Sequence, residues 1–234
     1  MIGSLVCSNS TEKCYLQQCN DCRNKSPSSI IGLTYLGNMN DEVSWFNWVR
    51  ISNKIHLQEM NGDMPTLLDN IDDQWPIILK HHYVKDQQRL YIDDVKKKSN
   101  DHSYVVVTCD FAENYTLVAQ REIQSAYWSH QQVAIFTIHI KIGDSHINLA
   151  AISDYLNHDT AFVYCCQQKI TDFIKNKFPS VKKIVYVSDG ASMHFKNKYN
   201  MMNLSFHKTD FLLEAEWLCT ATSHGKSASD GKIV

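Results

Sequence analysis

The chain lacks a long apolar run, a secretory leader and a marked net charge. No apolar stretch approaches the roughly 20 residues that span a bilayer, and the start, MIGSLVCSNS, has no apolar segment of the kind found in signal peptides. We therefore expect no membrane partner and a nuclear or cytoplasmic protein whose eight cysteines are mostly reduced. A formal net charge of −2 gives no general attraction to nucleic acid, so any contact with DNA must come from a local patch.

The composition is that of a folded protein. Of the 234 residues, 44% are apolar and 11% aromatic, which is enough for a sizeable core, and no repeat or low-complexity tract interrupts them. The length suits one large domain, alone or with a small appendage. The residue patterns predict a Cys-rich segment at 1–30, a mainly helical region at 31–100 and a catalytic-type core at 101–234.

Four of the eight cysteines cluster near the start with the spacing C-x6-C-x4-C-x2-C: Cys7, Cys14, Cys19 and Cys22. Four thiolates suffice for a tetrahedral zinc site, and the C-x2-C half has ordinary ligand spacing. The other half is irregular, and no second C-x2-C pairs with it. Two interpretations stay open: a structural Zn²⁺ site, or a flexible segment whose cysteines happen to cluster.

The helical region has two parts with different signals. Residues 35–60 hold several aromatic side chains without a clean period, so the pattern predicts no element type there. Residues 66–98 show helical periodicity, and Pro76 is expected to separate two helices.

The order of elements from residue 104 onward is easier to predict. A strand over about 104–110 precedes an excursion at 111–131 that we expect to be partly helical, and QVAIFTIHIKI and HINLAAIS then form a hairpin around Gly143-Asp144. An amphipathic helix, a strand ending at Asp189, a second helix and a strand over 215–222 follow. A hairpin beside crossover connections predicts a mixed sheet with helices on both faces. This is the element order of the RNase H-like fold.

Three acids stand where strands end: Asp110 after YVVVTC, Asp189 after KKIVYVS, and Asp230 beyond AEWLCTATS. Strand ends can bring carboxylates together rigidly, and a divalent metal prefers several hard oxygen ligands. We therefore predict a site for Mg²⁺ or Mn²⁺, of the two-metal kind that serves phosphodiester cleavage or strand transfer. The alternative is that each acid only caps a turn, since Asp-Gly is an ordinary turn dipeptide.

Basic and polar residues near these acids are candidates for contact with phosphate. His224 and Lys226 lie where a strand hands over to a helix, and backbone N–H groups at a helix start suit a phosphate oxygen. The lysine-rich stretch 169–198 includes Lys196, next to Asn197, and could follow a phosphate backbone. A solvated helix face is the simpler interpretation of that stretch.

Several motifs occur in an order that resembles a known family: LKHHYVKDQQ, CDFAENYTLVAQREIQSAYW, ISDYLNHDT, YVSDGASMHFKNKYN and AEWLCTATSHGKSASDG. The chain resembles transposable-element-derived proteins that look like DDE/DDD cut-and-paste transposases with an RNase H-like core. The resemblance covers about residues 5–231. It implies that Asp110, Asp189 and Asp230 are the catalytic, metal-binding acids, with DNA as the partner and a homo-oligomer as an open possibility.

The chain also departs from the family pattern. Ser229 stands where a Cys is usual, Met193 and His194 replace a small polar pair, and the sequence stops after Lys232-Ile-Val where a basic helix is expected. We therefore expect a truncated copy with impaired chemistry. The functional hypotheses are a metal-dependent DNA strand cleavage and transfer enzyme or its remnant, a non-enzymatic nucleic-acid or protein binding module, and a vestigial product.

Overall fold

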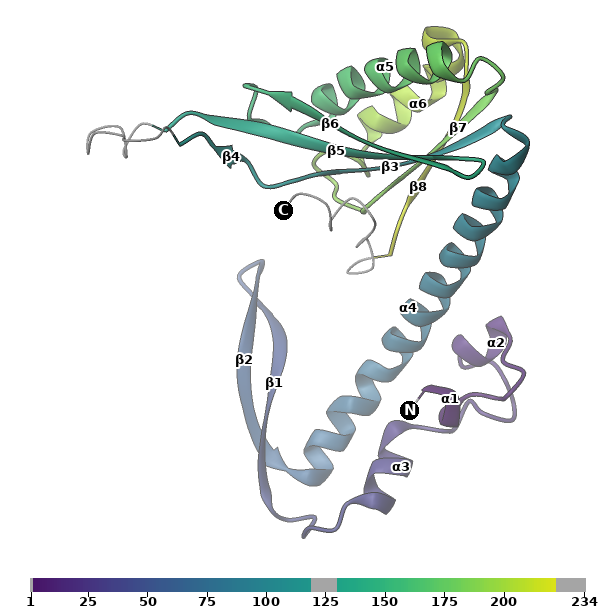
Figure 1. The fold of residues 1–234 in the computed structure, drawn as a ribbon. Coiled ribbons are helices and arrows are strands. Elements are labelled where there is room, and N and C mark those ends of the chain that lie inside the picture. Colours follow the sequence, from purple (N-terminus) through teal and green to yellow (C-terminus); the bar gives the residue numbers. More distant parts are fainter. Residues whose placement is uncertain (1, 119–129, 222–234) are drawn as a thin grey trace. The chain divides into compact units, whose positions relative to one another are not determined.

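The computed structural model describes residues 2–118 and 130–221 (Figure 1). The chain divides into two compact units, Met1–Asp86 and Gln87–Val234, and the division falls inside one long helix, α4 (Met64–Lys98). Asp230, His224 and Lys226 lie outside the described residues, as does most of the excursion predicted at 111–131. In the described part of the chain, no helix is long and apolar enough to cross a membrane.

The first unit is built around a small core between its short helices and α4. Its elements are α1 (Ile2–Leu5), α2 (Glu12–Tyr15), α3 (Pro27–Thr34), β1 (Glu42–Ile51), β2 (Lys54–Asp63) and the first part of α4. The buried residues of the core come from both ends of this segment: Leu5, Val6, Cys14, Cys22, Trp75 and Leu79. Two of the four clustered cysteines are therefore part of the apolar core.

The prediction that Pro76 separates two helices is wrong, because α4 continues through it. A proline inside a helix removes a backbone hydrogen bond and costs about 3 kcal/mol. On either side of it, Trp75 and Leu79 are only 3% and 2% exposed in the core of the first unit. Burying each such side chain contributes about 1.5–3 kcal/mol, so packing outweighs the local cost of the proline.

The aromatic-rich segment whose type the sequence left open is an antiparallel hairpin of β1 and β2. Its two turn residues, Ser52 and Asn53, have φ values of 46° and 67°. Positive φ at both positions is the geometry of the type I′ turn that matches the twist of a two-residue hairpin. The predicted mainly helical region thus also contains a two-stranded ribbon.

The second unit holds a mixed sheet that confirms the predicted RNase H-like fold class. Its strands are β3 (Tyr104–Phe111), β4 (Tyr115–Thr116), β5 (Gln132–Ile142), β6 (Ser145–Ser153), β7 (Lys183–Ser188) and β8 (Glu214–Cys219). The principal strands lie in the order β6-β5-β3-β7-β8. β3, β5 and β6 pair antiparallel, as the predicted hairpin at Gly143-Asp144 requires, whereas β3, β7 and β8 pair parallel.

Helices cover both faces of this sheet, as predicted. On one face, α5 (Thr160–Lys177) packs onto the alternate β3 residues Val105, Val107 and Cys109, and α6 (Lys198–Phe211) lies on the same side (Figure 1). On the other face, Ile92 and Val95 from the last turns of α4 contact Val106, Val185 and Val187. A short 3-10 helix, η1 (Ser99–Asp101), connects α4 to β3.

Candidate metal centres

Asp110 and Asp189 are brought to the same level of two neighbouring strands. β3 and β7 pair in parallel with a constant register, from Tyr104 opposite Lys183 to Thr108 opposite Val187. Continued for two more residues, this register places Asp110, the next-to-last residue of β3, level with Asp189, the first residue after β7. Backbones of neighbouring strands lie about 4.8 Å apart, so the two carboxylates belong to one locality.

The two acids also share a face of the sheet. Side chains alternate along a strand, so Asp110 lies on the side of Val106, and Asp189 on the side of Val185 and Val187. Those three valines form one buried cluster under the end of α4. Asp110 and Asp189 therefore continue the α4-covered face at its open end, where both are half-buried.

Electrostatic effects on the buried thiol of Cys109 are consistent with this proximity. Cys109 is 1% exposed, and its pKa is raised well above the ordinary thiol value, first by burial and then by the charges of nearby groups, among them Asp110 and Asp189. Both carboxylates thus act on the same group.

Backbone N–H groups orient each carboxylate. The N–H of Phe111 donates to Asp110 Oδ1 at 2.8 Å, and the N–H of Ala191 donates to Asp189 Oδ1 at 3.0 Å. On the strand beside β3, the Thr137 hydroxyl donates to the Asp110 carbonyl oxygen at 3.0 Å. Carboxylates held in this way are hard oxygen ligands, which fit Mg²⁺ or Mn²⁺.

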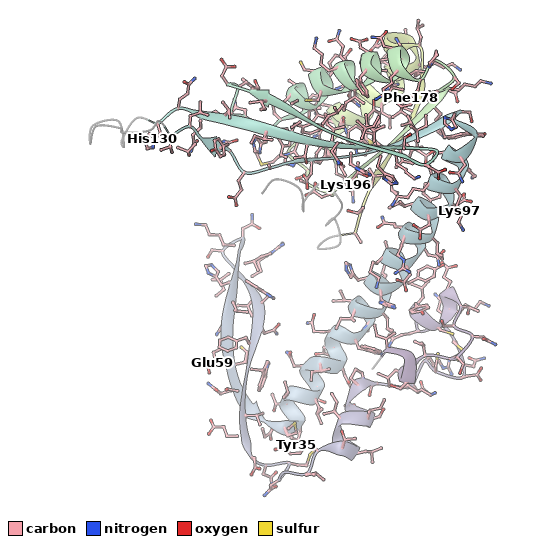
Figure 2. All side chains as sticks on the ribbon, in the orientation of Figure 1. Tyr35, Glu59, Lys97, His130, Phe178 and Lys196 are labelled. Atoms are coloured by element: carbon pink, nitrogen blue, oxygen red, sulfur yellow. The ribbon has the colours of Figure 1, made fainter. Side chains whose placement is uncertain are left out.

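Lys196 lies near the same strand ends, whereas Asn197 has a structural task. The pKa of Cys219, at the end of β8, is raised overall, chiefly by burial. The charge of Lys196 acts to lower it and the charge of Asp189 acts to raise it, so both side chains lie near this thiol. The Lys196 side chain is exposed and is labelled in Figure 2. Asn197 caps α6, because its Oδ1 accepts from the N–H groups of Tyr199 and Asn200. Its phosphate contact stays a prediction.

The residue after Asp110 anchors a polar aromatic cluster that the sequence did not suggest. Phe111 stacks on His158 with ring centroids 4.2 Å apart and meets His194 edge-on at 5.0 Å. His158 Nε2 lies 2.8 Å from Asn114 Oδ1, and burial, with the nearby His194, lowers its pKa. These residues belong to three of the motifs quoted above, CDFAENY, ISDYLNHDT and YVSDGASMHFKNKYN, but nothing in the sequence indicated that their side chains meet. They lie with Phe111, on the face opposite Asp110.

The four N-terminal cysteines converge on one point. The ligand atoms of Cys7, Cys14, Cys19 and Cys22 all lie within 4.8 Å of one another, and Cys7 Sγ is 3.8 Å from Cys19 Sγ. Sulfurs bound tetrahedrally to zinc at about 2.3 Å stand about 3.8 Å apart. The spacing is much longer than a disulfide, and all four are free thiols. The cluster could hold a metal such as zinc.

The surroundings of the cluster favour a thiolate at Cys14 and a protonated thiol at Cys7 when no metal is bound. Hydrogen bonding to the Thr11 backbone, opposed by partial desolvation and helped by the Thr11 hydroxyl, lowers the pKa of Cys14 to about 6. Hydrogen bonds with Cys22 and Cys19 raise the pKa of Cys7 to about 12. Cys14 and Cys22 are buried beside Leu5 and Trp75, so the site is closed by the core on one side. Four sulfur ligands and no open position are typical of structural zinc sites.

Comparisons with known proteins give little functional information. No curated protein matches the chain. Among solved structures, the chain is similar to one described as "Mos1 transposase paired-end complex with left transposon end", with 12% identity and a TM-score of 0.36. That match covers 61% of this chain and 42% of the other, so the chain spans less than half of that protein. A family model matches residues 88–232, more than half of the sequence, and the chain therefore belongs to the family described as Domain of unknown function (DUF8701).

Proposed function

We propose that residues 87–234 form a transposase-like core that cleaves or transfers DNA strands with a divalent metal held by Asp110 and Asp189. The observation that supports this most is the shared level and shared face of these two acids on neighbouring parallel strands. The motifs around them, CDFAENY and VSDGAS, resemble the corresponding blocks of DDE/DDD transposases.

In this proposal the chain's own residues bind and orient. Asp110 and Asp189 supply carboxylate oxygens that backbone N–H groups hold in place. Bound Mg²⁺ or Mn²⁺ would supply charge neutralisation for phosphate oxygens in the phosphodiester reaction. Lys196 offers a positive charge near the strand ends. Asp230 is proposed as a third ligand, and His224 and Lys226 as phosphate contacts.

We also propose that Cys7, Cys14, Cys19 and Cys22 bind one structural Zn²⁺ that stabilises the first unit. Support comes from the convergence of four thiols within 4.8 Å and from their place against the core. A metal at this position would link the segment after α1 to α2 and to the turn that follows it, on top of the core that these residues form with Trp75 and Leu79 of α4. A protein of this kind acts on DNA, so we propose a nuclear location.

A cleavage assay tests the catalytic part of the proposal. Full-length protein is incubated with supercoiled plasmid and with duplex oligonucleotides, with Mg²⁺, with Mn²⁺ or with a chelator. We expect metal-dependent nicking that falls to background in Asp110→Asn and in Asp189→Asn. The matched control is Asp144→Asn, an exposed acid in the β5–β6 turn.

Two results would count against catalysis. If nicking persists in both aspartate variants, it comes from a contaminant or from other residues. If the protein binds DNA with a steep decline in affinity as salt rises but never nicks it, the second unit is a binding module that retains the fold without the chemistry.

A further inference from the structure

The β1–β2 hairpin has one face that its own unit leaves uncovered. The register pairs Phe46 with Glu59, Trp48 with Leu57 and Arg50 with Ile55, so these six side chains lie on one side of the ribbon. We call this side the outer ribbon face. Its four large apolar side chains are 53–68% exposed: Phe46 65%, Trp48 68%, Ile55 60% and Leu57 53%.

The β1 half of the opposite side of the ribbon is partly covered by the first unit, whereas Lys54 and His56 near the turn are exposed there. Val43, Trp45, Asn47 and Val49 alternate with the outer residues and are half-buried. Asn47 Nδ2 donates to Asn70 Oδ1 of α4 at 3.4 Å, and a Cβ built on Gly62 would lie 3.3 Å from Thr66 and Trp45 side-chain atoms. One side is therefore anchored, and the first unit does not cover the apolar outer face.

The exposed apolar face of the hairpin has the properties of a binding surface. A two-stranded hairpin is marginally stable in water without a covering layer. Contiguous exposed apolar side chains, here including Trp48 and Phe46, are typical of interaction sites. Within the described residues, β1 and β2 pair only with each other, so their outer edges are also available to another chain.

The charges on the outer ribbon face change sign along the hairpin, from the turn to the base. Arg50 lies beside the turn, the four apolar residues follow, and Glu59 lies further from the turn, with Glu42 and Asp63 at the base on the same side. In the described part of the chain, Arg50 and Glu59 form no ion pair with any other side chain. The face is thus positive at its tip, apolar in its middle and negative at its base.

This order makes the face complementary to itself. A two-fold rotation about an axis along the Trp48–Leu57 row places two such faces against each other with their hairpins pointing in opposite directions, which is the isologous contact of a closed dimer. The Arg50–Ile55 row of one copy then lies opposite the Phe46–Glu59 row of the other. Each arginine meets an aromatic ring and a carboxylate, and the two Trp48–Leu57 rows meet in the centre.

We propose that the outer ribbon face is a homodimer interface, in which the hairpins of two copies of this chain stack in opposite directions. Nucleic acid is the less suitable occupant, because the face carries three acidic residues, Glu42, Glu59 and Asp63, and one basic residue, Arg50. Glu59 is labelled on β2 in Figure 2. The proposal concerns assembly and does not depend on the catalytic acids.

Sedimentation of the full-length protein tests the interface. A ribbon of two strands is smaller than a standard interface, so the concentration series runs from about 1 to 100 µM, where weak dimers dissociate. We expect a monomer–dimer equilibrium that Trp48→Glu weakens by at least about tenfold. Arg50→Glu and Glu59→Arg should each weaken association, and the double variant should restore it to within about threefold.

The control is Lys54→Glu, an exposed charge change on the opposite side of the same hairpin, which should leave association unchanged. Circular dichroism confirms that every variant keeps its fold, since all substituted side chains are exposed. A monomer throughout the series overturns the proposal, as does a dimer that ignores Trp48→Glu or is not rescued by the charge swap. The dimer proposal is also overturned if the protein is monomeric and Trp48→Glu lowers its affinity for duplex DNA. That result would assign the outer ribbon face to nucleic acid.

Discussion

Asp110 and Asp189 lie side by side at the ends of β3 and β7, although 79 positions (189 − 110) separate them in the sequence. The β3–β7 register has the same offset, from Tyr104 opposite Lys183 onward. Two carboxylates in one locality offer hard oxygen ligands of the kind that divalent cations prefer. This pair is the basis of the proposed chemistry.

Manganese should therefore stabilise the protein through this pair. A ligand at 100 times its dissociation constant raises the free energy of unfolding by about 2.7 kcal/mol, so thermal unfolding followed with increasing Mn²⁺ should shift upward. Asp110→Asn should remove the shift, because it replaces a carboxylate oxygen ligand with an uncharged amide. Asp144→Asn serves as the control. An equal shift in Asp110→Asn would place the bound metal elsewhere.

Zinc should be bound once per chain by the N-terminal cysteines. We expect elemental analysis of purified protein to give about one zinc per molecule, and Cys22→Ser to lower both the zinc content and the thermal stability of the first unit, because the removed thiol is buried beside Trp75. Cys165→Ser, at an exposed cysteine of α5, should change neither. Zinc-free protein of undiminished stability would rule out a structural metal.

Glu216 should contribute more to stability than Glu214 on the same strand. Glu216 accepts from Lys183 Nζ at 2.7 Å and from the Tyr91 hydroxyl, and its pKa is lowered because these bonds outweigh the effect of burial. We expect Glu216→Gln to cost about 1 kcal/mol in urea unfolding. Glu214 pairs with Lys208 at a surface where both side chains are more than half exposed, so solvent screens this pair and Glu214→Gln should cost clearly less than Glu216→Gln. Equal costs would mean that the Tyr91–Glu216–Lys183 network does not stabilise the fold.

The second unit should lose stability in mild acid because of His207. This side chain is 1% exposed, its Nδ1 donates to the Leu213 carbonyl at 2.8 Å, and its Nε2 accepts from the Tyr186 hydroxyl at 3.1 Å. Burial lowers its pKa below the ordinary value of 6.5. The folded state therefore binds this proton less readily than the unfolded state.

The consequence is a stability that is complete above pH about 6.5 and declines as the pH falls from there toward the lowered pKa of the folded state. Urea unfolding between neutral pH and pH 5 measures this. His207→Gln should flatten the decline at the cost of lower stability at neutral pH, while His146→Gln, on the exposed surface of β6, should preserve the slope. A slope that persists in His207→Gln would assign the acid sensitivity to other groups.

Local pattern predicted much of the second unit. The hairpin around Gly143-Asp144, the helix capped by Asp159 and the strands ending near Asp110 and Asp189 are formed as expected, because alternation, caps and turn residues act over a few positions. At Pro76 the same local rules gave a wrong result, since the burial of Trp75 and Leu79 outweighs the cost of a proline in a helix. The aromatic segment that became β1 and β2 had no usable period, because large apolar side chains lie on both of its faces, Trp45 on one and Phe46 and Trp48 on the other.

The sequence by itself determined which residue types were available: acids at strand ends, four early cysteines and the alternation that builds a mixed sheet. Tertiary structure decided which of them meet. The β3–β7 register brought Asp110 level with Asp189, the core around Trp75 gathered Cys14 and Cys22, and the anchoring of Trp45 and Asn47 left Trp48 facing outward. Such meetings depend on pairing between distant segments, and the free energy of that pairing is not contained in any local window of sequence.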